Sequence, residues 1–214
     1  MHDRRIDGQT YVFGNHGALW MNAMTWWDHQ TESVWTQPWG RALTGPLKGT
    51  QLKLIAYSLV PWETWKKEHP DTLALKVDSF YGQQTASDRF VAGVAIGDDA
   101  RGYPYPILAA AVVVNDTMGD LPLLIHTNPE TRSIHIFVRQ LSDGTLLTFE
   151  GTADALVDDV TGSTWNPERG LATDGALKGQ ALREIPYISS FDWAWHDFYP
   201  QTDFYVGPDT YVTP

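Results

Sequence analysis

The sequence predicts a mainly β protein of two homologous lobes, and three observations lead to this fold class. Residues 28–72 align without a gap on residues 158–202, with 16 identities in 45 positions, as expected of a duplicated unit. Gly and Pro separate short apolar runs, a pattern typical of short strands and tight turns. The 10 Trp, 9 Tyr and 8 Phe supply a sizeable core. We therefore expect a β-rich α+β fold in which each lobe is a small antiparallel sheet or half-barrel with one short aromatic helix, related by a pseudo-twofold.

The repeat opens with a D-x-x-T-x-S-x-W motif. Its four identical positions in the two copies are Asp28, Thr31, Ser33 and Trp35, then Asp158, Thr161, Ser163 and Trp165. In a strand, the alternating Thr, Ser and Trp share one face. Glycines that follow at the same spacing in both copies predict close turns between short strands.

A hairpin precedes the motif in each copy. Residues 5–14 contain the turn pair Asp7-Gly8, and residues 139–149 contain Asp143-Gly144, both typical of tight hairpin turns. Six more residues separate hairpin and motif in the first copy than in the second. Insertions of this kind usually lie in surface loops.

Each copy ends in a predicted aromatic helix, at residues 60–69 and 189–199, with Ser189 or Ser190 as the cap of the second helix. Between the copies, residues 90–137 predict strands at 91–96, 107–114, 121–126 and 133–139. No such block precedes the first hairpin. We therefore expect residues 1–75 to form the rear half of a first unit and residues 76–214 a complete second unit, packed as one globular domain.

Composition excludes several classes of function. A formal charge of −11 with only 15 Lys and Arg argues against nucleic acid or an anionic membrane as partner. The chain has no Cys, hence no disulfide, thiolate metal site or Cys nucleophile. No apolar run has the length of a membrane span, and the N-terminus lacks the apolar core of a signal peptide. We expect either a cytoplasmic protein or a trimmed piece of an exported one.

Several segments together resemble one family, DUF3179, whose function is unknown. They are Val94-Ala95-Ile96-Gly97, Ala100-Arg101-Gly102-Tyr103-Pro104, Val114-Asn115-Asp116, residues 28–37 and Gly45-Pro46-Leu47-Lys48-Gly49. The resemblance covers essentially the whole chain. It implies tandem units, an extracytoplasmic location and a front block with a Cys pair in the first unit. This chain lacks that block and has Ile125, His126 and Thr127 in the corresponding strand of the second unit, which suggests truncation or completion by another chain.

The repeated motif provides the candidate catalytic residues. Asp28, His29 and Ser33, with Asp158 and Ser163 in the second copy, contain the residue types of a hydrolase, and the repeated lysines offer a base. His29 stands out because Asp159 occupies its place in the second copy. The alternative is that Asp, Thr and Ser cap backbone groups while Trp packs. Because both copies keep the motif, shared scaffold is the favoured interpretation.

Other residues are candidates for a ligand site. Trp39 and Trp62 belong to a set without a Trp counterpart in the second copy, together with Trp26 and Trp27, and such a set could line a groove. Arg101, Arg139 and His126 complete the expected ligand-binding residues, since Arg binds carboxylate or phosphate. The alternatives are core packing for Trp and, for either Arg, pairing with Asp116 or another carboxylate of the scaffold.

No metal site or cofactor is expected. The histidines show no metal-ligand spacing, and the acidic stretches lack the spacing of a calcium loop, although their oxygens make calcium the one ion to consider.

Three functions stay open: a module that binds a small molecule or glycan in a cleft between the lobes, a hydrolase that uses Ser33 or Ser163, and an assembly protein whose open sheet edge is completed by another chain or by a homo-oligomer.

Overall fold

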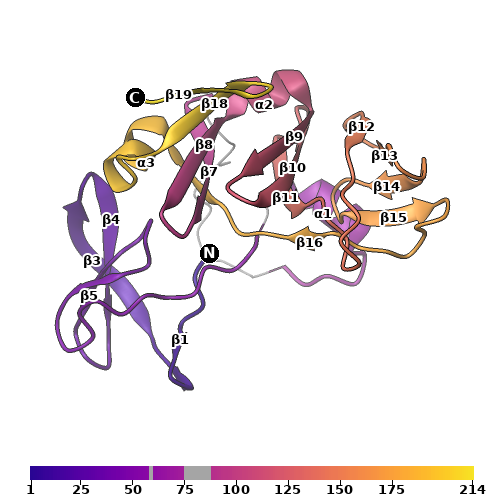
Figure 1. The fold of residues 1–214 in the computed structure, drawn as a ribbon. Coiled ribbons are helices and arrows are strands. Elements are labelled where there is room, and N and C mark those ends of the chain that lie inside the picture. Colours follow the sequence, from indigo (N-terminus) through magenta and orange to yellow (C-terminus); the bar gives the residue numbers. More distant parts are fainter. Residues whose placement is uncertain (58–59, 75–87) are drawn as a thin grey trace.

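The computed structural model describes residues 1–57, 60–74 and 88–214, and in these it contains five β-sheets and three short helices (Figure 1). The mainly β class is therefore confirmed. The expected boundary between residues 75 and 76 lies outside the described residues. Two sheets form the centre of the molecule, and a four-stranded sheet lies at each end of the view in Figure 1.

The first end sheet has the order β3-β4-β5-β6, and every neighbouring pair is antiparallel. Its strands are β3 (Phe13–Trp20), β4 (Ala23–Asp28), β5 (Val34–Thr36) and β6 (Ala42–Thr44). The predicted hairpin before it is β1 (Arg5–Ile6) and β2 (Gln9–Thr10). Its Asp7-Gly8 turn has φ of 49° and 81°, the positive values that a two-residue hairpin turn requires.

The other end sheet has the order β12-β13-β14-β15 and is also antiparallel throughout. Its strands are β12 (Phe149–Gly151), β13 (Leu156–Asp158), β14 (Thr164–Asn166) and β15 (Leu171–Asp174). The six residues by which the copies differ lengthen β3 and β4. The insertion therefore extends a hairpin rather than forming an irregular loop.

The central sheets contain the segment between the two copies and the end of the chain. One has the order β17-β7-β8-β18-β19 and the other β16-β11-β10-β9. The strands of the first are β7 (Phe90–Ile96), β8 (Asp99–Pro104), β17 (Ile188–Phe191), β18 (Asp203–Gly207) and β19 (Thr210–Val212). Those of the second are β9 (Val113–Met118), β10 (Leu121–Asn128), β11 (Ser133–Val138) and β16 (Arg183–Glu184).

Two local predictions were wrong. Residues 107–114 were expected to be a strand, but α2 (Tyr105–Ala111) occupies most of them and β9 follows. A short apolar run does not distinguish strand from helix, and here Pro106 in the first turn and three consecutive Ala favour helix. Ser189 and Ser190 do not cap a helix but pair with β7 as part of β17.

The remaining helices are α1 (Trp62–Glu68) and α3 (Asp192–Phe198), both close to their predicted ranges. Each carries one Trp whose indole N–H donates to a Thr seven residues later. The Trp65–Thr72 and Trp195–Thr202 bonds are both 2.8 Å. The two helical segments thus contain the same Trp–Thr hydrogen bond, although Trp195 is buried and Trp65 is 40% exposed.

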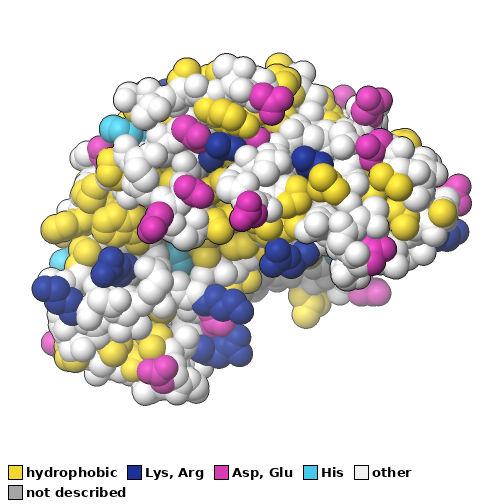
Figure 2. Space-filling view, viewed as in Figure 1, with side chains coloured by type: hydrophobic (Ala, Val, Ile, Leu, Met, Phe, Trp, Pro, Cys, Tyr) yellow, Lys and Arg dark blue, Asp and Glu magenta, His cyan; other side chains and the backbone are white. Residues whose placement is uncertain are grey.

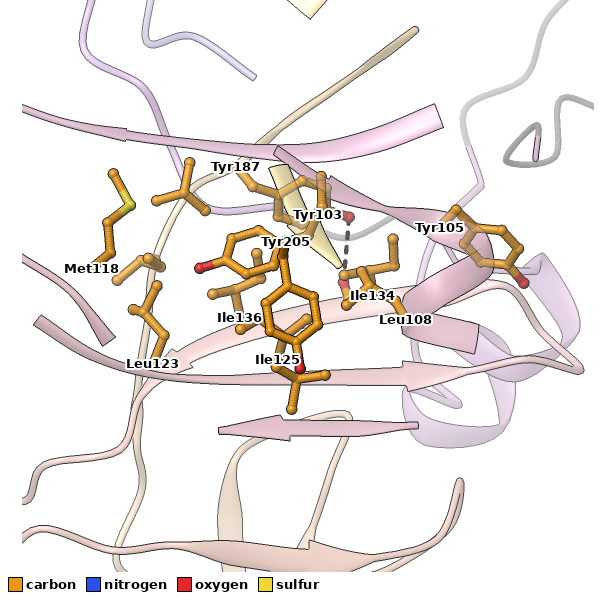
Figure 3. Packing of buried hydrophobic residues seen from close by; sticks show 14 of the residues in the cluster. Tyr103, Tyr105, Leu108, Met118, Leu123, Ile125, Ile134, Ile136, Tyr187 and Tyr205 are labelled. Atoms are coloured by element: carbon orange, nitrogen blue, oxygen red, sulfur yellow. Dashed lines mark hydrogen bonds between the residues drawn. The ribbon is translucent and has the colours of Figure 1, made fainter. Parts of the chain in front are cut away.

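The main core lies between the central sheets (Figure 3). Tyr103, Leu123, Ile125 and Ile136 are fully buried in it, and the hydroxyl of Tyr187 donates to the carbonyl of Ile134 at 3.3 Å. The opposite face of β10 and β11 contributes to a second core against β12–β15, because successive side chains of a strand point to opposite faces. β10 and β11 are therefore buried on both sides.

Candidate functional site

The D-x-x-T-x-S-x-W motif forms the same hydrogen bonds in both copies. The Trp35 indole donates to Asp28 Oδ2 at 2.9 Å, as the Trp165 indole does to Asp158 Oδ2. Burial acts to raise the pKa of both carboxyls, but hydrogen bonds from Trp, Thr and Ser outweigh burial and leave each pKa lowered. Each aspartate is therefore a buried anion that organises the turn around it.

The hydroxyl groups of Ser33 and Ser163 are used within this motif. Each is fully buried, bonds a Thr hydroxyl at 2.7 Å, and accepts a backbone N–H, from Leu47 or Leu177, at 3.1 Å. A nucleophile needs an exposed oxygen with a base in reach. The geometry therefore supports a scaffold role and gives the serine nucleophile no support.

His29 and its counterpart lie at the surface and make different contacts. The His29 ring stacks on Trp27 with centroids 4.4 Å apart, and Asp159 accepts a hydrogen bond from the amide of Thr148 at 2.8 Å. Within residues 1–57, 60–74 and 88–214, no three His, Asp or Glu side chains come together as a metal site. The replacement of His29 by Asp159 in the second copy therefore does not bring catalytic side chains together.

The predicted ligand residues Arg101 and Arg139 are held by the scaffold. Arg101 donates to Asp203 through two nitrogens, at 2.7 and 2.9 Å, and to Asp116 at 3.0 Å. Pairing with a scaffold carboxylate was the alternative that the sequence left open for this residue. Arg139 donates to the carbonyl of Leu147 at 2.9 Å. The Arg101 guanidinium therefore joins β8 to β18 and β9, and that of Arg139 holds the segment before β12.

His126 is fully buried, and burial lowers its pKa to about 4, so its imidazole is neutral. It lies opposite His135 in the β10–β11 ladder. His135 is held between Glu168, at 3.0 Å, and Glu184, at 3.4 Å. Burial acts to lower the pKa of His135, but the two carboxylates outweigh it and raise the pKa. The pair connects β10 and β11 to the second end sheet, because His126 bonds the carbonyl of Thr152 and His135 bonds Glu168.

The two predicted tryptophans lie apart from each other. Trp39 packs edge-on against Phe198 and donates its indole N–H to the carbonyl of that residue at 3.1 Å. It therefore joins the first end sheet to α3. Trp62 is 48% exposed at the start of α1. The structure does not bring the five predicted ligand residues together.

A cleft of about 660 Å³ opens instead between the first end sheet and the β17–α3 segment. Phe13 and Trp26 form one wall, and Phe191 and Trp193 belong to the other. The residues Met1, His2 and Arg4 and the segment around Leu52, Leu54 and Tyr57 also line it. Apart from a few polar groups, the lining is aliphatic and aromatic, which is typical of a binding site.

One edge of the cleft is an extended stretch of main chain. Residues 1–3 pair with residues 53–55: the Asp3 amide donates to Lys53 at 2.8 Å, and the Ile55 amide donates to Met1 at 2.9 Å. His2 faces Leu54 in this bridge. Because backbone groups alternate between the two sides of a strand, the N–H and C=O of His2 point to the other side.

The same arrangement occurs in the second copy, where β11 pairs with β16. Phe137 faces Glu184, and the Ile185 amide donates to Ile136 at 2.9 Å. A glycine lies under the ring at this position in both copies: a Cβ on Gly40 would meet His2 at 2.4 Å, and one on Gly170 would meet Phe137 at 2.7 Å. His2 therefore occupies the position of Phe137.

The wall of the cleft also has counterparts in the second copy. Phe13 and Trp26 pair with Asp28 and Trp35, as Phe149 and Leu156 pair with Asp158 and Trp165. Phe149 and Leu156 are buried in one cluster with Leu124 of β10 and Phe137 of β11. The cleft of the first copy therefore corresponds to the position that β10 occupies on the second end sheet.

The sequence identified Trp26 through its unpaired position but missed Phe191, Trp193 and the backbone of residues 1–3. Nothing local marks Phe191 or Trp193 as wall residues, because residues near 24 and residues near 190 come to line one cleft only in the folded chain.

Among the described residues, no helix is long and apolar enough to cross a membrane. No curated protein and no solved structure matches the chain. One family model matches twice, over residues 1–88 and 81–202, and its description is "Protein of unknown function (DUF3179)". The two matches together span nearly the whole sequence and follow one another as the repeat does, so the chain belongs to the DUF3179 family.

Proposed function

We propose that this protein binds an extended, apolar polypeptide strand in the cleft beside residues 1–3. The observation that supports this most directly is the match between the cleft and the position of β10 in the second copy. The docked strand would pair with His2 as β10 pairs with Phe137, where Leu124 is the opposite residue. Such strand addition combines main-chain hydrogen bonds with pockets for alternate side chains.

The proposal includes a finer view of the fold. We infer that the two end sheets, with their hairpins and aromatic helices, are copies of one unit related by a pseudo-twofold. The equal Trp–Asp, Ser–amide and Trp–Thr bonds support this inference. In the second copy the unit is covered by β10 and β11, and in the first its corresponding face lines the cleft.

A peptide with the sequence of β10 (Leu121–Asn128), carrying a fluorophore, tests the proposal by fluorescence anisotropy. We expect saturable binding, and weaker binding of a peptide with Asp at the Leu124 position, because a carboxylate would have to enter an apolar wall. Absence of binding by the parent peptide, or equal binding of both peptides, would contradict strand docking.

Two variants of His2 separate main-chain pairing from side-chain contacts. His2→Pro removes the N–H that points away from residues 53–55, whereas the bonds to those residues use Met1 and Asp3. We expect His2→Pro to weaken peptide binding about fivefold or more, the value of one hydrogen bond, and His2→Ala to keep the N–H and bind more tightly than His2→Pro. Equal affinities would place the peptide elsewhere, for example in exchange with β10.

A small apolar ligand is the second candidate. The volume of about 660 Å³ falls within the usual range for small-molecule sites. Six aromatic residues line the space: Phe13, Trp26, Tyr57, Phe90, Phe191 and Trp193. The dye anilinonaphthalene sulfonate serves as probe. Trp193→Ala should reduce its fluorescence gain, whereas Trp62→Ala should not, because Trp62 lies outside the cleft although it is more exposed, 48% against 38%. Equal effects of the two substitutions would remove this candidate.

A further inference from the structure

The hairpin of β3 and β4 ends in an apolar tip that the cleft does not explain. Leu19 is 70% exposed, Trp20 47%, Met21 36% and Met24 40%. Leu19, Trp20 and Met21 lie outside the lining of the cleft, although Met24 borders it. Figure 2 shows hydrophobic side chains gathered over this hairpin. A contiguous exposed patch of this kind marks an interaction surface more often than single apolar residues do.

The turn of this hairpin places a large apolar residue where the backbone disfavours it. Met21 and Asn22 have φ of 49° and 58°, the left-handed values that Asn and Gly adopt most readily. The β1–β2 hairpin has the same kind of turn with Asp7-Gly8. Met21 is therefore kept at a conformational cost without being buried, which points to a role outside the folded chain.

Charge is distributed so that this lobe differs from the rest of the molecule. Residues 13–27 contain no Asp, Glu, Lys or Arg. Residues 1–57 contain five Lys and Arg against four Asp and Glu, a net charge of +1. Because the whole chain carries −11, the other residues carry −12. The five basic residues Arg4, Arg5, Arg41, Lys48 and Lys53 are all exposed. One of the acidic residues, Asp28, is buried.

We propose that the β3–β4 tip docks this protein on a phospholipid surface. Trp, Leu and Met at a protruding tip have the chemistry of an interfacial anchor, since the Trp ring prefers the headgroup level and the aliphatic groups the acyl boundary. Residues 13–27 contain no charged side chain, so the tip enters the headgroup region without desolvating a charge. The lobe as a whole carries a net charge of +1, which makes it the part of this acidic protein that anionic headgroups repel least.

Cosedimentation with vesicles of phosphatidylcholine and phosphatidylglycerol tests this docking surface. We expect wild-type protein to bind at millimolar lipid. The affinity of the double variant Leu19→Glu, Met21→Glu for the vesicles should be lower by a factor of about ten or more. Val160→Glu is the matched control, because Val160 is 54% exposed in a turn of the second end sheet. Circular dichroism verifies that all variants fold, and Trp20→Ala tests the tip without adding charge.

Two results would overturn the proposal. One is failure of the wild type to bind vesicles, or equal binding of the tip variants and Val160→Glu. The other is a concentration-dependent dimer that the tip substitutions dissociate, since the occupant of the patch would then be a second copy of the chain. Peptide binding in the cleft is measured without lipid, so loss of docking and loss of strand binding are distinguishable.

Discussion

Three buried tryptophans offer a controlled measurement of what a buried carboxylate contributes to the stability of this fold. Trp35, Trp165 and Trp195 are at most 1% exposed. Each donates its indole N–H at nearly the same distance: 2.9 Å to Asp28, 2.9 Å to Asp158 and 2.8 Å to Thr202. The acceptor is an anion in the first two and a neutral hydroxyl in the third.

Replacing each Trp by Phe removes the same volume and the same donor. The cost of the cavity is therefore similar in the three variants and largely cancels in the comparison. A hydrogen bond to a charged group contributes about 1.5–3 kcal/mol, and one to a neutral group about 0.5–1.5 kcal/mol. We expect Trp35→Phe and Trp165→Phe to lower the free energy of unfolding by about 1–2 kcal/mol more than Trp195→Phe does.

Urea unfolding followed by circular dichroism at neutral pH gives the three free energies of unfolding. An unchanged m-value, the slope of that free energy against urea concentration, shows that only stability has changed. If Trp195→Phe costs as much as the other two variants, the carboxylates do not organise their turns, and the interpretation of the repeated motif as an anion-centred scaffold is wrong.

Two further predictions concern the β11 interface. Gly170→Ala should be more destabilising than Gly40→Ala by about 1–3 kcal/mol, because both glycines have positive φ but the added methyl meets buried Phe137 in one case and half-buried His2 in the other; equal thermal shifts would show that the first copy is as tightly covered as the second. The raised pKa of His135 means that its contribution is fully present below its usual pKa of 6.5 and is lost as pH rises through the higher, folded value. The pKa of His126 is lowered to about 4, so its contribution to stability changes only below pH 6.5 and does not affect the slope above that pH. The unfolding free energy of the wild type should therefore fall above pH 6.5, and His135→Gln should flatten this fall; an equal slope in both proteins would exclude His135 as its source.

Strand binding and docking on lipid would place the two functional surfaces on one lobe. The cleft lies on one side of β4, and the apolar tip lies at the end of the same strand, so Met24 belongs to both. The second end sheet has neither feature, because β10 and β11 cover its face and its first two strands have only three residues each.

Local sequence determined the elements whose signals are short-range. They are the Asp-Gly turn of residues 7–8, the two aromatic helices before Pro70 and Pro200, and the strands predicted at 91–96 and 133–139, which follow from turn chemistry and periodicity. The repeat identified Asp28, Ser33 and Trp35 as scaffold, because a motif kept in both copies serves what both share. Residues 107–111 were misassigned because an apolar run of that length fits a strand and a helix equally well.

The site depended on tertiary structure. Trp39, Trp62, Arg101, His126 and Arg139 were each reasonable ligand residues by type, but their partners lie far along the chain, and residue type does not reveal that Asp203 and Asp116 occupy Arg101. The cleft exists because Trp26 and Trp193, 167 positions apart in the sequence, face the same space. Side-chain chemistry is local, whereas the burial and pairing that decide its use come from long-range packing, and only the fold supplies that.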